Sequence, residues 1–257
     1  MEPDHADPRG CPHAEGRDRS VRLAGILGAR LRAGAIGNGA AESGDAVLID
    51  PERGFFAVGD SSDREPRTAG MFMRHFSGFL AGMSALSHGV LTDDLIDALQ
   101  REIVFRSRDM LRDFPFRGTT TFTGVLLLRT GCRTRGILLH AGDSVLFSHH
   151  PQKGLRRMTK NNFWLLGKTR EFYQAEPFEV APGERFLFAT DGIRDMSPPD
   201  GRGLDAFLPE LFRRCPVEDI PDALIDSCDV EKDGRDDLAV MSLAPDKPFP
   251  KGPAILL

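Results

Sequence analysis

Cysteine is scarce in this sequence, and no two cysteines are spaced as in a zinc site. Only four cysteines occur in 257 residues, and the C-x-x-C spacing is absent. We interpret all four as reduced thiols, which is typical of proteins in a reducing compartment. The N-terminus also lacks the positive start and apolar stretch of a secretory signal. The sequence therefore predicts a cytoplasmic protein.

Long apolar runs and an excess of basic charge are absent as well. No apolar run approaches the roughly 20 residues that a membrane-spanning helix requires, so no membrane partner is predicted. The 33 basic and 38 acidic side chains give a net charge of −5. A nucleic-acid binder usually carries a clustered basic excess, so no nucleic-acid partner is predicted. The oligomeric state stays open.

Several well-known catalytic motifs are also missing. The sequence has no P-loop, no dinucleotide-binding glycine motif and no G-x-S-x-G elbow around Ser144. These absences argue against kinase and oxidoreductase functions and against Ser144 as a nucleophile.

The hydrophobic content of 40% is enough to bury a core. Residues 1–20 show no apolar periodicity and predict a flexible tail. Residues 21–246 are expected to form the folded domain, and residues 247–257 a C-terminal extension. The stretch 21–38 fits either a strand or a short helix.

Strand-like and helix-like patterns occur in separate runs, which is typical of an α+β fold with antiparallel sheets and helices stacked outside. Apolar spacing predicts two helices, at 68–88 and 92–114, that pack as an antiparallel pair, the second capped by Thr92. Further helices are expected at 204–214 and 218–228, strands at 45–50, 54–60, 120–129, 135–141, 145–149, 184–190 and 238–243, and a long loop at 150–183.

Aspartates stand at the ends of several predicted strands. Asp60 and Asp191 each end an apolar strand, Asp143 lies in a turn, and Asp236 precedes the last strand. Hard divalent cations such as Mg²⁺ or Mn²⁺ take oxygen ligands held at fixed points. Two such ions can polarise a phosphoryl oxygen and activate water. Each aspartate alone is more typical of a turn than of a metal site, so the interpretation depends on the whole set.

The motifs around these aspartates follow a known order. They are Phe-Phe-Ala-Val-Gly-Asp at 55–60, Gly-Thr-Thr-Thr-Phe-Thr-Gly-Val at 118–125, His-Ala-Gly-Asp-Ser at 140–144, Phe-Ala-Thr-Asp-Gly-Ile-Arg-Asp at 188–195 and Arg-Asp-Asp-Leu-Ala-Val at 235–240. The series resembles the successive motifs of the metal-dependent Ser/Thr protein phosphatases (PPM family, type 2C), in an atypical bacterial style. The resemblance covers about residues 37–244.

The resemblance implies a fold and an activity. The fold would be a four-layer αββα sandwich, in which two antiparallel sheets are flanked by paired antiparallel helices. The activity would be hydrolysis of phosphoserine or phosphothreonine in a phosphorylated protein, a signalling reaction. A metal-activated hydroxide would attack the phosphate directly, without a phosphoenzyme.

The resemblance also implies roles for individual residues. Asp60 would bridge two Mn²⁺ or Mg²⁺ ions, with the Ser61 carbonyl as a further ligand. Asp191 and Asp236 would complete the first metal site, so Asp60, Asp191 and Asp236 form the catalytic set. Asp143, together with Asp191, would match the ligands of a third ion. Asp45 would help to hold metal-bound water.

The second metal site departs from the family pattern. Gly44 stands where the family has an acidic ligand, and serines replace the glycines that follow Asp60. Glu42 or Asp63 could supply the missing carboxylate. The resemblance implies two ions, and a third at Asp143, while the second site lacks its usual acidic ligand.

The arginine that binds the substrate phosphate in the family is also absent, because Ala40 occupies its position. Arg64 and Arg67 are the first candidates to replace it, and Arg235 is another. If no replacement exists, the alternative is a catalytically impaired pseudophosphatase that acts as a regulatory binding module.

The long loop at 150–183 corresponds to a variable flap near the active site of the family. Its basic stretch from Lys153 to Lys160 could attract a phosphorylated partner or simply form a solvated face. The apolar residues Phe163, Trp164, Leu165 and Leu166 are expected to fasten the loop to the core. The histidines that flank Asp143 are not expected to bind metal, because neighbouring strand residues point to opposite faces.

Overall fold

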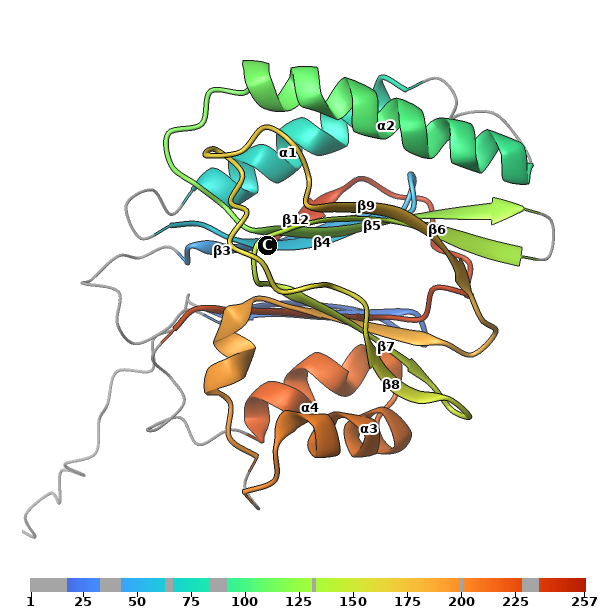
Figure 1. The fold of residues 1–257 in the computed structure, drawn as a ribbon. Coiled ribbons are helices and arrows are strands. Elements are labelled where there is room, and N and C mark those ends of the chain that lie inside the picture. The colour runs from blue at the N-terminus through green and yellow to red at the C-terminus, as the bar shows by residue number, and fades with distance from the viewer. Residues whose placement is uncertain are drawn as a thin grey trace, which may run out of the picture.

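Alternating apolar residues build two antiparallel six-stranded sheets, which stack face to face (Figure 1). The structure, a computed structural model, describes residues 18–32, 43–62, 67–83, 92–130, 133–198, 201–227 and 236–257. The first sheet, called the β4 sheet, has the order β12 (Ile255–Leu256), β3 (Asp45–Asp50), β4 (Phe55–Asp60), β5 (Phe122–Thr130), β6 (Arg133–Ala141) and β9 (Gln174–Val180).

The second sheet, called the β10 sheet, lies beneath the first in Figure 1. Its order is β1 (Asp18–Leu23), β2 (Leu27–Arg32), β11 (Leu238–Leu243), β10 (Arg185–Ala189), β7 (Val145–His150) and β8 (Gly154–Arg157).

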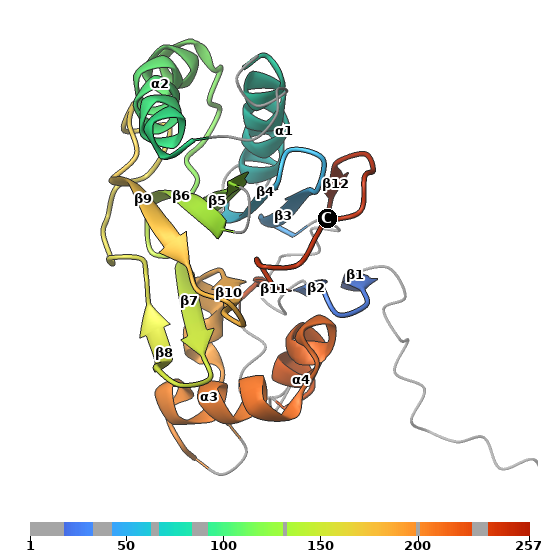
Figure 2. The same ribbon diagram turned by 90° about the vertical axis from the view of Figure 1, so that its right-hand side faces the viewer.

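Helices cover the outer face of each sheet (Figures 1 and 2). The β4 sheet carries α1 (Thr68–Ala81) and α2 (Asp93–Asp113), and the β10 sheet carries α3 (Leu204–Arg214) and α4 (Ile220–Asp226). The four-layer α+β sandwich expected from the sequence is therefore confirmed. No helix in the described ranges is both long enough and apolar enough to cross a membrane.

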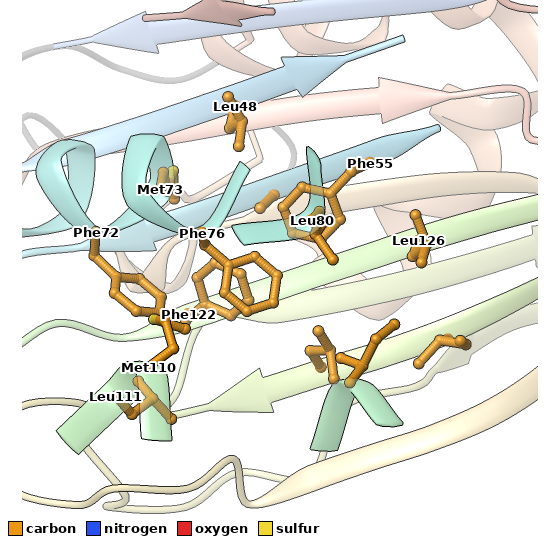
Figure 3. Close-up of a cluster of buried hydrophobic side chains, with 14 of the residues drawn as sticks. Leu48, Phe55, Phe72, Met73, Phe76, Leu80, Met110, Leu111, Phe122 and Leu126 are labelled. Carbon is orange, nitrogen blue, oxygen red and sulfur yellow. The ribbon is translucent and has the colours of Figure 1, made fainter. Parts of the chain in front are cut away.

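The period-two alternation of the central strands explains the layers. In β4, Phe55 and Ala57 face the helices, whereas Phe56 and Val58 face the other sheet, and all four side chains are buried. Figure 3 shows the helix side, where Phe72 and Phe76 of α1 pack against Phe55 and Phe122. A third buried cluster joins α3 and α4 to the β10 sheet.

The helix starts and contacts follow the local sequence. Thr92 caps α2 as predicted, because its Oγ1 accepts a hydrogen bond from the Leu95 N–H at 3.4 Å. The guanidinium of Arg106 on α2 lies 5.9 Å from the Phe79 ring of α1. Helix α1 ends at Ala81, and residues 84–88, which were expected to continue it, lie outside the described part.

Two strands, β8 and β9, lie within the segment that was expected to be a loop. Both are edge strands. Strand β9 reads Gln-Ala-Glu-Pro-Phe-Glu-Val, with polar side chains on both faces and Pro177 inside it. An edge strand tolerates this proline because no second neighbour needs its missing N–H. Because its sequence is polar and contains a proline, β9 was not predicted as a strand.

Both ends of the chain contribute more structure than the sequence indicated. Strand β1 begins at Asp18, inside the expected tail, and β1 and β2 form a hairpin where strand or helix was left open. Residues 255–256 of the expected extension form β12, which pairs with β3. Phe249 and Ile255 pack against the core between the sheets, so apolar burial fixes this segment.

Candidate active site

Strand ends from both sheets meet at one edge of the sandwich. Asp45 begins β3 and lies directly opposite Asp60, the last residue of β4. Thr190 and Asp191 directly follow β10. The Thr190 hydroxyl donates a hydrogen bond to Asp45 Oδ2 at 2.6 Å, which joins the β10 sheet to the β4 sheet at this edge.

Thr190 is fully buried and serves as both donor and acceptor. Its Oγ1 also accepts a hydrogen bond from the Ala239 N–H at 2.9 Å, and its own N–H donates to the Ala239 carbonyl at 3.1 Å. One side chain therefore links β10, β11 and the buried carboxyl group of Asp45.

Replacement of Thr190 by Val is expected to destabilise the fold by about 2–4 kcal/mol, because it leaves Asp45 and the Ala239 N–H buried without this partner. Thr190→Ser keeps the hydroxyl and is expected to lose less than about 1 kcal/mol. Urea denaturation of both variants measures the difference. Equal stability of Thr190→Val and Thr190→Ser would contradict this role of the hydroxyl.

Burial and like charge perturb the carboxyl groups at this edge. Burial, followed by the charge of Asp191, raises the pKa of Asp60 from 3.8 to about 7. Burial, followed by the charge of Asp60, raises the pKa of Asp45 well above its usual range. The pKa of Asp191 is raised by burial and by the charges of Asp143 and Asp236. A group of buried carboxylates that repel one another is stabilised by any cation bound among them.

These shifts predict a pH-dependent stability of the metal-stripped protein. Because the pKa of Asp60 is higher in the folded state, the folded state binds its proton more tightly than the unfolded state does. This stabilisation is complete below pH about 4 and is lost as the pH rises through about 7. We expect the free energy of unfolding in EDTA to fall between pH 5 and pH 8.

Guanidinium denaturation at the two pH values measures this effect, and Asp60→Asn is its control. The other titratable groups that face Asp60 are Asp45, Asp143, Asp191 and Asp236. Asp60→Asn is expected to reduce the loss of stability between pH 5 and pH 8. An identical pH dependence in wild type and Asp60→Asn would show that the Asp60 carboxyl does not cause it.

Gly44 lies beside oxygen atoms of Asp60, Ser61 and Asp237. Its N–H donates to Asp237 Oδ2 at 2.6 Å, and its carbonyl accepts from the Ser61 N–H at 3.0 Å. A Cβ at this position would lie 3.4 Å from the Ser61 carbonyl oxygen, 3.5 Å from Asp237 Oδ2 and 3.8 Å from Asp60 Oδ1. A side chain at position 44 would therefore point among these oxygens.

Ser61, the expected carbonyl ligand, also stabilises the start of a helix. Its Oγ accepts a hydrogen bond from the Ala69 N–H at 2.8 Å, in the first turn of α1. Its neighbour Asp60 is fixed from the other side, because the carbonyl of Asp60 accepts from Thr121 N–H and Thr120 Oγ1, both at 2.8 Å. The serine that replaces the expected glycine thus ties the site to α1.

Asp237, which stands beside Asp236 at the start of the last strand, was given no role of its own, yet it accepts the hydrogen bond from the Gly44 N–H and raises the pKa of Asp45. Asp236 is more exposed, and its Oδ1 accepts from the Asp237 N–H at 2.9 Å. Gly192 fits the site because a Cβ there would lie 2.3 Å from the Asp237 carbonyl oxygen. Close approach of η2 (Asp191–Asp195) to the residue before β11 requires this glycine.

Asp143 lies in the turn between β6 and β7, where Gly142 adopts a positive φ of 102°. Its carboxylate accepts a hydrogen bond from Arg194 at 3.0 Å, and its carbonyl accepts another at 3.1 Å. Arg194 also donates to Asn161 Oδ1 at 2.9 Å. This ion pair could not be predicted from the sequence, because its partners are fifty-one residues apart in the chain.

The segment 158–173, called the flap, is fastened beside the site. Leu166 exchanges backbone hydrogen bonds with Thr120, both at 3.0 Å, and the Trp164 indole donates to the Glu171 carbonyl. His140 is buried and contacts Thr123 and the Lys160 carbonyl, and burial lowers its pKa to about 4. Phe163 was expected to anchor the flap, which is wrong, because it is fully exposed.

Most of the residues predicted to replace the missing carboxylate and the missing arginine lie outside the described part of the chain. Arg67 precedes α1, and its carbonyl accepts from the Met71 N–H. Ala40, Glu42, Asp63, Arg64 and Arg235 lie outside the described residues.

The donor set fits a hard divalent cation in its chemistry. Carboxylate and carbonyl oxygens are the ligands that Mg²⁺ and Mn²⁺ prefer, and burial together with neighbouring negative charge raises the pKa of Asp60 and of Asp191. Within the part of the chain that the structure describes, no three His, Cys, Asp or Glu residues are already arranged to hold a metal ion. The carboxylates would have to turn toward one another to share one.

The sequence matches one family along most of its length. The family described as Stage II sporulation protein E (SpoIIE) matches residues 50–245. The chain belongs to the SpoIIE family. The matched segment begins at the end of β3 and reaches past β11, so it includes Asp60, Asp143, Asp191 and Asp236. Among curated proteins, none matches the sequence significantly.

Solved structures show that this SpoIIE-family chain has the PPM phosphatase fold. It is similar to the PPM Ser-Thr phosphatase MsPP from Mycobacterium smegmatis, with 17% identity, a TM-score of 0.59, and coverage of 84% of this chain and 97% of MsPP. It is also similar to PppA, a regulatory component of the type VI secretion system of Pseudomonas aeruginosa, with 16% identity and a TM-score of 0.60. That match covers 89% of this chain and 98% of PppA. The catalytic domain of the phosphatase PstP, whose structure contains two manganese ions, matches with 20% identity and a TM-score of 0.57. That match covers 93% of this chain and 98% of the PstP domain.

Proposed function

We propose that this protein is a metal-dependent phosphatase that hydrolyses phosphoserine or phosphothreonine in a protein substrate. Membership of the SpoIIE family and the PPM fold support a phosphatase of this general kind. The observation that carries the proposal is the group of carboxyl groups from both sheets at one edge, with raised pKa values on Asp45, Asp60 and Asp191. Such perturbed groups are typical of functional sites.

The proposed ligands come from four separate segments. Asp60, Asp191 and Asp236 would hold Mn²⁺ or Mg²⁺ through carboxylate oxygens, with the Ser61 carbonyl as a further ligand of a second ion. When bound, such a cation lowers the pKa of a water molecule and stabilises charge on a phosphoryl oxygen. Asp143 is the candidate ligand of a third ion, although it is held by Arg194 in the structure.

The protein's own groups orient this set. Thr190 fixes Asp45 by a short hydrogen bond, and Asp45 lies against Asp60. Asp45 would therefore be held in position to help bind metal-bound water beside Asp60. Thr120 and Thr121 hold the backbone of Asp60. Such hydrogen bonds to the backbone fix the orientation of Asp60 as a metal ligand.

The test is turnover of p-nitrophenyl phosphate and of a phosphothreonine peptide with Mn²⁺, with Mg²⁺ and with EDTA. We expect turnover with a divalent cation and none with EDTA. Arg156→Gln, which removes an exposed positive charge on β8, is the surface control and is expected to keep this turnover. Lack of turnover by folded protein at every metal concentration would refute the enzymatic proposal.

The second candidate function is a regulatory binding module with the same fold. It is favoured by Gly44, which leaves the second metal site without its usual carboxylate, and by the lack of a ready three-residue metal site among the described residues. A module of this kind would bind a phosphorylated protein without hydrolysing it. Retention of a phosphopeptide without release of phosphate would distinguish it from the enzyme.

A further inference from the structure

Two arginine side chains converge beside the carboxylate group. The Nη2 atoms of Arg194 and Arg157 lie 2.9 Å and 3.5 Å from the same atom, Asn161 Oδ1. Arg194 belongs to η2 and Arg157 to β8, so the two residues reach this point from different elements. Burial and then the charge of Arg194 lower the pKa of Arg157, as expected for guanidinium groups that share an acceptor.

The pair lies at the rim of the proposed active site. Arg194 follows Asp191 by three residues, and its Nη1 and Nη2 donate to the carboxylate and the carbonyl of Asp143. Its side chain is 43% exposed, so solvent and a ligand can reach it. Arg194 also acts on Asp191, whose pKa it lowers against the effects of burial and neighbouring acids.

Two adjacent positive charges repel each other, and one ion pair with Asp143 would suffice to fix the turn. A phosphate group, in contrast, carries up to two negative charges and several acceptor oxygens, and guanidinium groups match it through paired N–H donors. The Asn161 oxygen shows that one acceptor can reach both arginines at once. Ala40 occupies the position of the arginine that would bind the substrate phosphate, so another residue must bind the phosphate here.

We propose that Arg157 and Arg194 form the binding site for the phosphate group of the phosphorylated protein substrate. The ligand class rests on the proposed function, whereas the pair itself rests on the geometry. Asp205 and Asp143 are the acidic groups that act on Arg157. A phosphate oxygen replaces Asn161 as the shared acceptor, while Asp143 keeps its hold on Arg194.

The experiment measures binding without turnover. The probe is a fluorescent peptide that carries a phosphonate analogue of phosphothreonine, in which carbon replaces the ester oxygen, so no phosphatase can release the phosphate. Its affinity is compared with that of the unphosphorylated peptide, with Mn²⁺ and with EDTA. The variants are Arg157→Gln, Arg194→Gln and, as matched control, Arg156→Gln. Arg156 neighbours Arg157 on β8 but points to the opposite face.

We expect Arg157→Gln and Arg194→Gln each to weaken binding of the phosphonate peptide by about tenfold or more. Arg156→Gln should change it by less than about twofold. Inorganic phosphate should compete with the peptide in wild type. Thermal unfolding identifies a folding defect in Arg194→Gln, and Arg157→Gln, which leaves the Asp143 ion pair intact, then decides the matter alone.

Unchanged affinity in Arg157→Gln, or an equal loss in Arg156→Gln, would overturn the inference, as would a lack of phosphate-dependent binding in wild type. The proposed function fails separately. Phosphonate binding that depends on both arginines, without turnover of a phosphothreonine peptide, would support the binding site and refute the enzyme.

Discussion

Replacement of Asp191 by Asn is expected to reduce Mn²⁺-dependent turnover of a phosphothreonine peptide by at least about 10³-fold. The charge of Asp191 raises the pKa of Asp60, and the charges of Asp143 and Asp236 raise the pKa of Asp191, so Asp191 belongs to one group of interacting carboxylates. Asn keeps the size of the side chain and loses the charge that a cation needs. Phosphate release at saturating Mn²⁺ measures the effect.

The same substitution should not weaken the fold. Because burial and neighbouring charges raise the pKa of Asp191, its negative charge is unfavourable in the folded state. We therefore expect Asp191→Asn to be at least as stable as wild type at pH 8 in EDTA. Loss of turnover together with retained or increased stability would identify a functional carboxylate. Turnover within about tenfold of wild type would exclude Asp191 as a ligand of the catalytic metal.

Replacement of Gly44 by Asp is expected to lower the Mn²⁺ concentration for half-maximal activity by about tenfold or more, because it adds a charged ligand to the oxygen set. A Cβ at this position meets the Ser61 carbonyl, Asp237 and Asp60 only at ordinary contact distances, 3.4–3.8 Å. The Cβ of an introduced aspartate therefore fits without a clash and directs its carboxylate toward these oxygens.

Gly44→Asn is the matched control, since it has the same shape without the charge. In EDTA, the added charge should make Gly44→Asp less stable than Gly44→Asn, because Asp60 and Asp237 repel it. With Mn²⁺ the order should reverse. If both variants respond to Mn²⁺ as wild type does, position 44 does not face a metal site.

The sequence predicted the fold best where the apolar pattern is strong. Strand β11 and helix α3 have the expected bounds, 238–243 and 204–214. Strand β9 was missed because its side chains are mostly polar and because it pairs with β6, a strand distant in sequence. Strand β8 was missed because it is short and ends in two exposed arginines, although it pairs with β7 directly before it. Periodicity reports burial, and an edge strand buries little.

The candidate site shows the same division. Strand-end aspartates could be recognised because turns and motifs mark them along the chain. The partners that hold them could not, since Thr190 meets Asp45 only after the two sheets stack, and Arg194 meets Asp143 only after β7 pairs with β10. Gly44 was noted as a missing ligand, but its central position among oxygens follows from the register of β3 and β4.

A calorimetric titration of Mn²⁺ into metal-stripped protein at pH 7.5 tests the central claim most directly, because both the enzyme and its metal site depend on the strand-end carboxylates. We predict saturable binding of at least one ion, weakened by about tenfold or more in Asp191→Asn. Proton release should accompany binding, since Asp60 has a raised pKa of about 7. Folded protein that shows no saturable Mn²⁺ binding would contradict the account.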